Sequence, residues 1–213
     1  MKKMVLAVII SSIVIIQLNC DDSSVSTPQN TQLCVSGQVS NWTYGSNKTV
    51  QAKILSETHN NYIVASTTID AQGNFNICLP ATVSDTSLYV GDSIFTTGCS
   101  KINVNFNPPD TKGTQVWNFM VYSSDSLMGY LKKNNYSVIS AGAYSLMYIY
   151  VNKNVTVSGW EYCFPGDTSR FDGTAISGWN KIVKNCIRAD TASRTYLYNT
   201  TEPSGGVWKF VSY

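Results

Sequence analysis

The sequence predicts an all-β protein. Apolar and polar or small side chains alternate through most of the chain after residue 31, as where Phe75, Ile77 and Leu79 are interleaved with Asn and Cys. Clusters of Gly, Asn, Pro and Ser separate these short alternating segments. No stretch repeats its apolar residues at the spacing of a long amphipathic helix. Period-two alternation bounded by turn residues is typical of strands with one face in the core and one in water.

The strands can be placed in order along the chain. One segment, 143–151, is apolar on both faces, which predicts a central strand buried on both sides. Residues 126–133 begin with Ser126 and are the one candidate for a short helix. The expected strands cover residues 33–39, 50–54, 62–68, 74–79, 102–106, 116–122, 143–151, 156–162, 173–183, 195–199 and 207–211.

A turn-rich stretch at 107–113 suggests a boundary between two modules. It contains Pro108 and Pro109, which cannot donate hydrogen bonds to a sheet. We therefore expect a first β module over residues 32–109 and a second, antiparallel β module over residues 110–213.

Two motifs of the first module resemble a known family. Val35-Ser-Gly-Gln-Val39 opens a strand, and about thirty residues later a turn over Asp70 to Gly73 leads into a Phe-x-Ile-x-Leu strand. Over residues 32–107 this pattern resembles the carboxypeptidase regulatory-like, transthyretin-type β-sandwich. The resemblance implies a transthyretin/prealbumin-like β-sandwich that serves as an accessory or scaffolding module. It carries over no catalytic residue.

The first twenty residues predict export and a lipid anchor. Lys2 and Lys3 precede an apolar stretch, 4–18, whose helical length of about 22 Å is short of the roughly 30 Å hydrocarbon core. This favours a cleavable signal peptide over residues 1–19. Gln17-Leu18-Asn19-Cys20 resembles the lipobox of bacterial lipoproteins, although Asn19 stands where a small residue is usual. The resemblance implies that Cys20 carries diacylglycerol and anchors the protein to the cell envelope, at the outer membrane or cell surface.

Polar residues 21–31 follow as an expected flexible tether. The charges of the chain are few and scattered. The chain has 15 basic and 13 acidic residues, and loss of Lys2 and Lys3 with the signal would leave 13 of each. Nucleic-acid binding requires a clustered basic surface, so this class of partner is excluded. The expected contact with the membrane is made by the lipid.

Five cysteines remain beyond the expected lipidation site. In an oxidising compartment such cysteines are expected to pair. Cys163 and Cys186 lie near the ends of two strands that we expect to be neighbours, which predicts a disulfide between them. For Cys34, Cys78 and Cys99, a Cys34–Cys78 pair and a Cys78–Cys99 pair both remain open.

No catalytic, cofactor or metal site is predicted. The single histidine, His59, lies in an expected turn, and the chain has no Cys-x-x-Cys and no glycine-rich phosphate loop. These features indicate a non-enzymatic protein. The alternative is an extracellular hydrolase of glycosides or peptides, whose acids, Glu161, Asp167, Asp172 and Asp190, would have to converge in the second module.

Aromatic residues are the one enriched chemistry, with 13 Tyr, 7 Phe and 5 Trp. They could fill the core, or form a surface on which a ligand stacks. Trp160 and Trp179 each follow a Ser-Gly pair and are the candidate residues for such a ligand platform. The expected function is therefore a binding or structural module at the cell surface that recognises an unknown protein or glycan.

Overall fold

The computed structural model describes residues 32–54, 62–94, 99–163 and 166–213. This part of the chain forms fifteen β-strands and two short 3-10 turns, and it contains no α-helix. The all-β prediction is confirmed. No helix of the described residues is long and apolar enough to cross a membrane. The expected signal peptide, Cys20, the tether and His59 lie outside the described residues.

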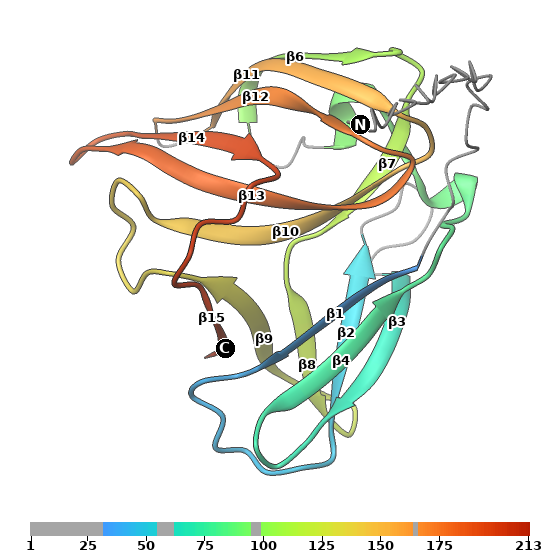
Figure 1. Cartoon of the computed structure of the whole chain (residues 1–213), viewed down its shortest axis with the longest axis vertical. Coiled ribbons are helices and arrows are strands. Elements are labelled where there is room, and N and C mark those ends of the chain that lie inside the picture. Colours follow the sequence, from blue (N-terminus) through green and yellow to red (C-terminus); the bar gives the residue numbers. More distant parts are fainter. Residues whose placement is uncertain (1–31, 55–61, 95–98, 164–165) are drawn as a thin grey trace, which may run out of the picture.

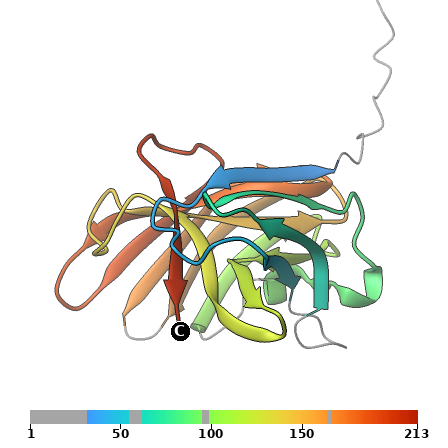
Figure 2. The same cartoon turned by 90° about the horizontal axis from the view of Figure 1, so that it is seen from below.

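The strands belong to one hydrogen-bonded sheet that is arranged in two groups (Figure 1). The first strand group has the order β1-β4-β3-β2-β8-β9-β15. A bridge between Val39 and Trp208 brings β15 next to the end of β1, so the group curls around a common core (Figure 2). Its strands are β1 (Leu33–Gln38), β2 (Lys48–Ile54), β3 (Tyr62–Ile69), β4 (Asn74–Leu79), β8 (Phe119–Ser123), β9 (Ser126–Asn134) and β15 (Val207–Ser212).

The second strand group has the order β7-β10-β13-β14-β12-β11-β6. Its neighbours are antiparallel except for β12 and β14, which run parallel. The strand β5 (Tyr89–Val90) pairs with β7, between the 3-10 turns η1 (Asp85–Ser87) and η2 (Gly91–Ile94). The strands of the group are β6 (Cys99–Asn107), β7 (Lys112–Val116), β10 (Tyr144–Val151), β11 (Val155–Cys163), β12 (Asp167–Ala175), β13 (Gly178–Ala189) and β14 (Arg194–Asn199).

Strand β10 lies between the two cores, as its sequence predicts. Every residue of β10 is buried. Tyr148 and Tyr150 pack into the core of the first group, whereas Met147, Ile149 and Val151 pack into the core of the second. Alternate side chains of a strand point to opposite faces, so β10 contributes to both cores.

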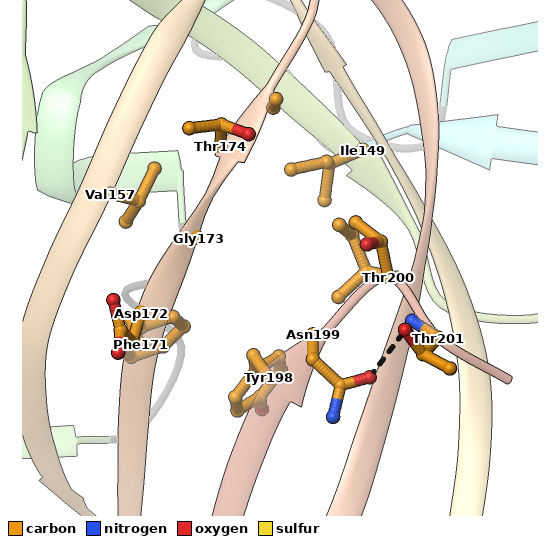
Figure 3. Close-up of a pocket in the computed structure, with 12 residues that line it drawn as sticks. Ile149, Val157, Phe171, Asp172, Gly173, Thr174, Tyr198, Asn199, Thr200 and Thr201 are labelled. Carbon is orange, nitrogen blue, oxygen red and sulfur yellow. Dashed lines mark hydrogen bonds between the residues drawn. The ribbon is translucent and has the colours of Figure 1, made fainter. Parts of the chain in front are cut away.

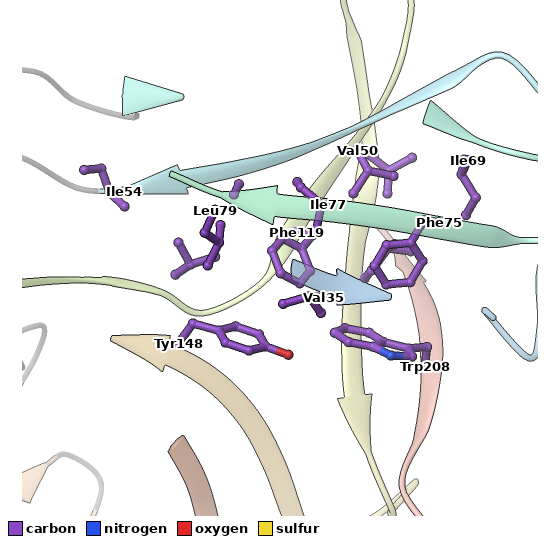
Figure 4. Close-up of a cluster of buried hydrophobic side chains, with 14 of the residues drawn as sticks. Val35, Val50, Ile54, Ile69, Phe75, Ile77, Leu79, Phe119, Tyr148 and Trp208 are labelled. Atoms are coloured by element: carbon purple, nitrogen blue, oxygen red, sulfur yellow. The ribbon is translucent and has the colours of Figure 1, made fainter. Parts of the chain in front are cut away.

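The core of the first group is built around aromatic rings (Figure 4). The indole of Trp208 on β15 lies edge-on to the ring of Phe75, with 5.0 Å between the ring centres. This indole also covers Gly37 on β1, where a Cβ atom would lie 2.2 Å from the indole carbon Cδ1. A glycine near the end of β1 therefore makes the space for a ring from the last strand of the chain.

Three expectations about the chain path are wrong. The stretch 107–113 does not separate two sheets, because β6 pairs with β11 and β8 pairs with β2. Residues 126–133 form strand β9, which is held between β8 and β15, so sheet pairing overrides the weak helical tendency. Residues 116–122 are two strands, because the chain crosses from the second group to the first at Trp117 and Asn118.

The predicted Cys163–Cys186 disulfide is also wrong. Cys163 bonds to Cys99, which lies opposite it on β6. The strands β12 and β14 separate β11 from β13, so Cys163 and Cys186 are not on neighbouring strands. Cys186 is a buried free thiol that donates a hydrogen bond to the carbonyl oxygen of Arg188. Of the two pairings left open for Cys78, the one with Cys34 forms. Cys34 of β1 and Cys78 of β4 lie directly opposite each other in the sheet.

Candidate functional site

Strands β6, β11 and β12 present a polar face with an exposed tryptophan. Trp160 on β11 is 41% exposed and lies between Asn103 of β6 and Arg170 of β12 in the strand register. Alternation places the exposed ring of Tyr162 on the same side of β11. We call this surface the outer face; its exposed side chains are Asn103, Asn105, Ser158, Trp160, Tyr162, Arg170 and Asp172.

The register of the outer face places hydrogen-bonding groups beside an aromatic ring. One row across the strands is Asn103, Trp160 and Arg170, and the next contains Asn105, Ser158 and Asp172. A shallow hollow beside the indole is lined by Gly159, Trp160, Thr168 and Arg170. The outer face thus offers a flat apolar surface bordered by amides, hydroxyls and charged groups.

Trp179 is not part of this surface, which corrects the predicted pairing of Trp160 with Trp179. Trp179 is 7% exposed and belongs to the core of the first strand group. Its indole nitrogen donates a hydrogen bond to the carbonyl oxygen of Pro80, 2.9 Å away, and its ring packs edge-on against Tyr150. A ring enclosed in this way cannot stack on a ligand.

An apolar cavity opens where strand β14 ends. β14 pairs with β12 only as far as Phe171 and with β13 only from Val183 onwards. Near the turn that joins β12 and β13, no strand therefore lies between their facing edges, although β12 still pairs with β11 and β13 with β10. The cavity measures about 220 Å³. Figure 3 shows Val157 and Phe171 on one side of the cavity, and Ile149 together with the polar segment 199–201 on the other. Within that segment, the backbone N–H of Thr201 donates to the side-chain oxygen of Asn199.

The four acids considered for hydrolysis occupy different settings. Asp172 lies on the outer face and at the rim of the apolar cavity. Asp190 accepts hydrogen bonds from the backbone of Ala192 and Ser193, which stabilises the turn between β13 and β14. These hydrogen bonds hold the pKa of Asp190 below its usual value. Asp167 accepts a hydrogen bond from the backbone N–H of Arg194 and lies 3.9 Å from its guanidinium.

Glu161 is the buried acid of the four. It is 4% exposed, and its Oε2 atom has no hydrogen-bond partner among the described residues. Burial raises the pKa of the Glu161 carboxyl, while a hydrogen bond from Ser169 and the charge of Lys184 act in the opposite direction. The Ser169 hydroxyl is also hydrogen-bonded to Tyr198. Glu161 therefore belongs to a buried polar cluster inside the second strand group.

The Glu161 carboxylate and the sulfurs of Cys99 and Cys163 lie within 4.8 Å of one another. The two sulfurs are bonded to each other as a disulfide, so neither is a thiolate available to a metal. This cluster therefore does not provide a metal site in the oxidised protein.

Sequence reasoning identified Trp160 but missed its neighbours. Asn103 comes from β6 and Arg170 from β12, and only the strand register brings both next to Trp160. The alternation of Asn103, Asn105 and Asn107 with apolar residues was the available signal, because it marks an outward polar row. No protein-family model, curated protein or solved structure matches this chain.

Proposed function

We propose that this protein is a non-enzymatic, lipid-anchored envelope protein whose outer face binds a carbohydrate chain. The observation that carries the proposal is the exposed indole of Trp160 between Asn103 and Arg170. A sugar ring has an apolar face of C–H groups and a rim of hydroxyls. The C–H face can stack on the indole, while the amide and guanidinium hydrogen-bond to the rim.

The geometry of the outer face favours an extended ligand. Tyr162, Trp160 and Ser158 follow one another along the same side of β11, with polar partners on both neighbouring strands. Alternate residues of a strand lie nearly 7 Å apart, so this side of β11 offers a linear series of contacts. A polymer chain that runs along β11 could use several of them at once.

We also propose that the resemblance to the transthyretin-type β-sandwich applies to strands β1–β4 only. The Val35-Ser-Gly-Gln-Val39 segment, which begins within β1, and the turn over Asp70 to Gly73 support a transthyretin-type origin for β1–β4. At the turn, the Asp70 carboxylate accepts hydrogen bonds from the backbone N–H groups of Gln72 and Asn74. The strands β8, β9 and β15 complete this group, so the proposal concerns β1–β4 and not an independent module over residues 32–109.

Trp160→Ala should weaken binding to an insoluble glycan by at least about tenfold, because the variant loses the central stacking surface. The full chain, purified in detergent, would be incubated with peptidoglycan, chitin or cellulose, and the unbound fraction measured. Tyr213→Ala is the matched control, because it removes an exposed aromatic ring from outside the outer face.

The proposal would be contradicted if Trp160→Ala bound as well as the wild type to every glycan that the wild type binds. It would also be contradicted if the wild type bound none of the glycans. Release of soluble sugar by the wild-type protein would favour the hydrolase alternative.

Anchoring through Cys20 is tested separately. Radiolabelled palmitate fed to expressing cells should enter the wild-type protein and not Cys20→Ala, because the lipid is attached to the Cys20 thiol and its new amino terminus. Cys186→Ala is the control for a cysteine change that leaves the anchor intact. Label in Cys20→Ala equal to that in wild type would show that Cys20 is not the acylated residue.

A further inference from the structure

A second polar site lies between strand β9 of the first strand group and strands β10, β13 and β14 of the second, away from the outer face. Lys184 of β13 is registered opposite Ser145 of β10 on one side and Tyr198 of β14 on the other. Its ammonium lies 4.2 Å from the ring centre of Tyr196 and 5.5 Å from that of Trp117. Aromatic faces attract a cation but supply no counter-charge.

A second lysine faces the same space. Lys132 of β9 and Lys184 both line a cavity of about 120 Å³. The cavity is also lined by Ser145 and by three aromatic residues whose rings contact the two ammonium groups, Tyr136, Tyr196 and Trp117. None of the described lining residues is acidic. The cavity therefore brings two lysines together with residues that carry hydroxyl groups, and it has the volume of a few water molecules at about 30 Å³ each.

The two ammonium groups lack close anionic partners. Within the described residues, neither Lys132 nor Lys184 has a carboxylate within 4.0 Å, whereas Lys133 and Lys181 both pair with Glu202. The ammonium group of Lys132 lies over the ring of Tyr136, and that of Lys184 lies over the ring of Tyr196. Within the described residues, the ammonium groups of Lys132 and Lys184 thus have no carboxylate at ion-pair distance.

The charged groups around Lys184 act from a greater distance. Burial lowers the pKa of Lys184, while the charges of Glu161 on β11 and Asp167 on β12 raise it. Asp167 is itself engaged by Arg194, and the positive charge of Lys132 lowers the pKa of Lys184 further. The surrounding protein therefore compensates the Lys184 ammonium only in part, and a bound anion would stabilise it.

We propose that the cavity between Lys132 and Lys184 binds a small oxyanion, that is, a phosphate or carboxylate group. The ammonium groups would supply charge-assisted hydrogen bonds, and the Ser145 hydroxyl would donate to a remaining oxygen atom. Ser145 and Tyr196 are both buried, so these interactions would form where little water competes. The site uses none of the outer-face residues, and its test is independent of glycan binding.

The test is calorimetric titration of the full chain in detergent with inorganic phosphate and with acetate, at constant ionic strength set by chloride. We expect saturable binding of at least one probe, with affinity reduced at least about tenfold in Lys132→Met and in Lys184→Met. Phosphate binding alone would identify a phosphate group, and acetate binding alone a carboxylate. Lys153→Met is the control, because Lys153 pairs with Asp110 and does not line the cavity.

One further variant and a spectroscopic check keep the test independent of folding defects. Lys132→Arg retains the charge and should retain binding, whereas Lys132→Met should lose it while keeping the wild-type circular dichroism spectrum. Absence of saturable binding of both probes to the wild type would overturn the proposal. Unchanged affinity in both methionine variants would do the same.

Discussion

Trp208→Ala should lower the free energy of unfolding by about 3–5 kcal/mol, which is the usual cost of truncating a large buried aromatic residue. Trp208 is 6% exposed and lies at the centre of the first strand group. Its ring centre is 5.0 Å from that of Phe75 and 5.8 Å from that of Phe119. Removal of the indole would leave a cavity that the rigid sheet cannot readily close.

Hydrogen bonds around Trp208 also join β15 to the residues that follow β1. The backbone N–H of Ser40 donates to the carbonyl oxygen of Trp208, and Asn41 exchanges hydrogen bonds with the backbone of Phe210. Denaturant unfolding of wild type and Trp208→Ala, followed by far-ultraviolet circular dichroism, would measure the decrease in the free energy of unfolding. Tyr213→Ala, which changes a residue that is 75% exposed, should shift stability by about 0.5 kcal/mol or less.

A double-mutant cycle would attribute the loss to packing over Gly37. Gly37→Ala should cost about 1–3 kcal/mol in the wild type, because its Cβ would overlap the indole. The same change should cost much less in Trp208→Ala, where the indole is gone. Additive effects of the two changes would mean that the ring does not rest on Gly37, and would contradict the packing described above.

The alternation of apolar and polar side chains was sufficient to predict most of the strands, because the apolar positions of a strand face the core. The segment 143–151 is the clearest case: both of its faces are apolar, and β10 is buried on both faces. Partner strands could not be predicted in the same way. The pairing of β6 with β11 and of β8 with β2 depends on contacts between residues far apart in the chain.

The two Ser-Gly-Trp segments show why local pattern alone does not identify a surface site. Trp160 and Trp179 follow the same two residues, yet Trp160 is exposed and Trp179 is buried. Trp179 packs into the core of the first strand group, which covers that part of β13. On the outer face of β11, Trp160 stays 41% exposed. The difference lies in tertiary packing, which the two local sequences do not encode.

The cysteine pairing failed for a related reason. The prediction of Cys163–Cys186 assumed that their strands are adjacent, but β14 runs parallel to β12 and enters between β12 and β13. Disulfides require close Cα atoms, so one misplaced strand changes the whole pairing. In the structure each bonded pair joins directly registered strands, with a Cα–Cα distance of 3.9 Å in both.

The Cys99–Cys163 bond should contribute about 4 kcal/mol to stability in the chain-entropy model, because it closes a loop with a sequence separation of 64. The double variant Cys99→Ala/Cys163→Ala should lose stability of that order in denaturant unfolding under non-reducing conditions. Cys186→Ala is the discriminating control. It removes one buried thiol and should cost only about 1 kcal/mol, close to the value of one buried methylene.

Peptide mapping without reduction checks the same assignment directly. It should recover the peptide that contains Cys163 joined to that of Cys99, with Cys186 available to alkylation after unfolding. A Cys163 peptide joined to Cys186 would restore the pairing first expected from the sequence. In that case Cys186→Ala would break a disulfide, and its cost would approach that of the double variant. The relative stabilities of the two variants therefore distinguish the two disulfide arrangements, and with them the placement of β12 and β14 between β11 and β13.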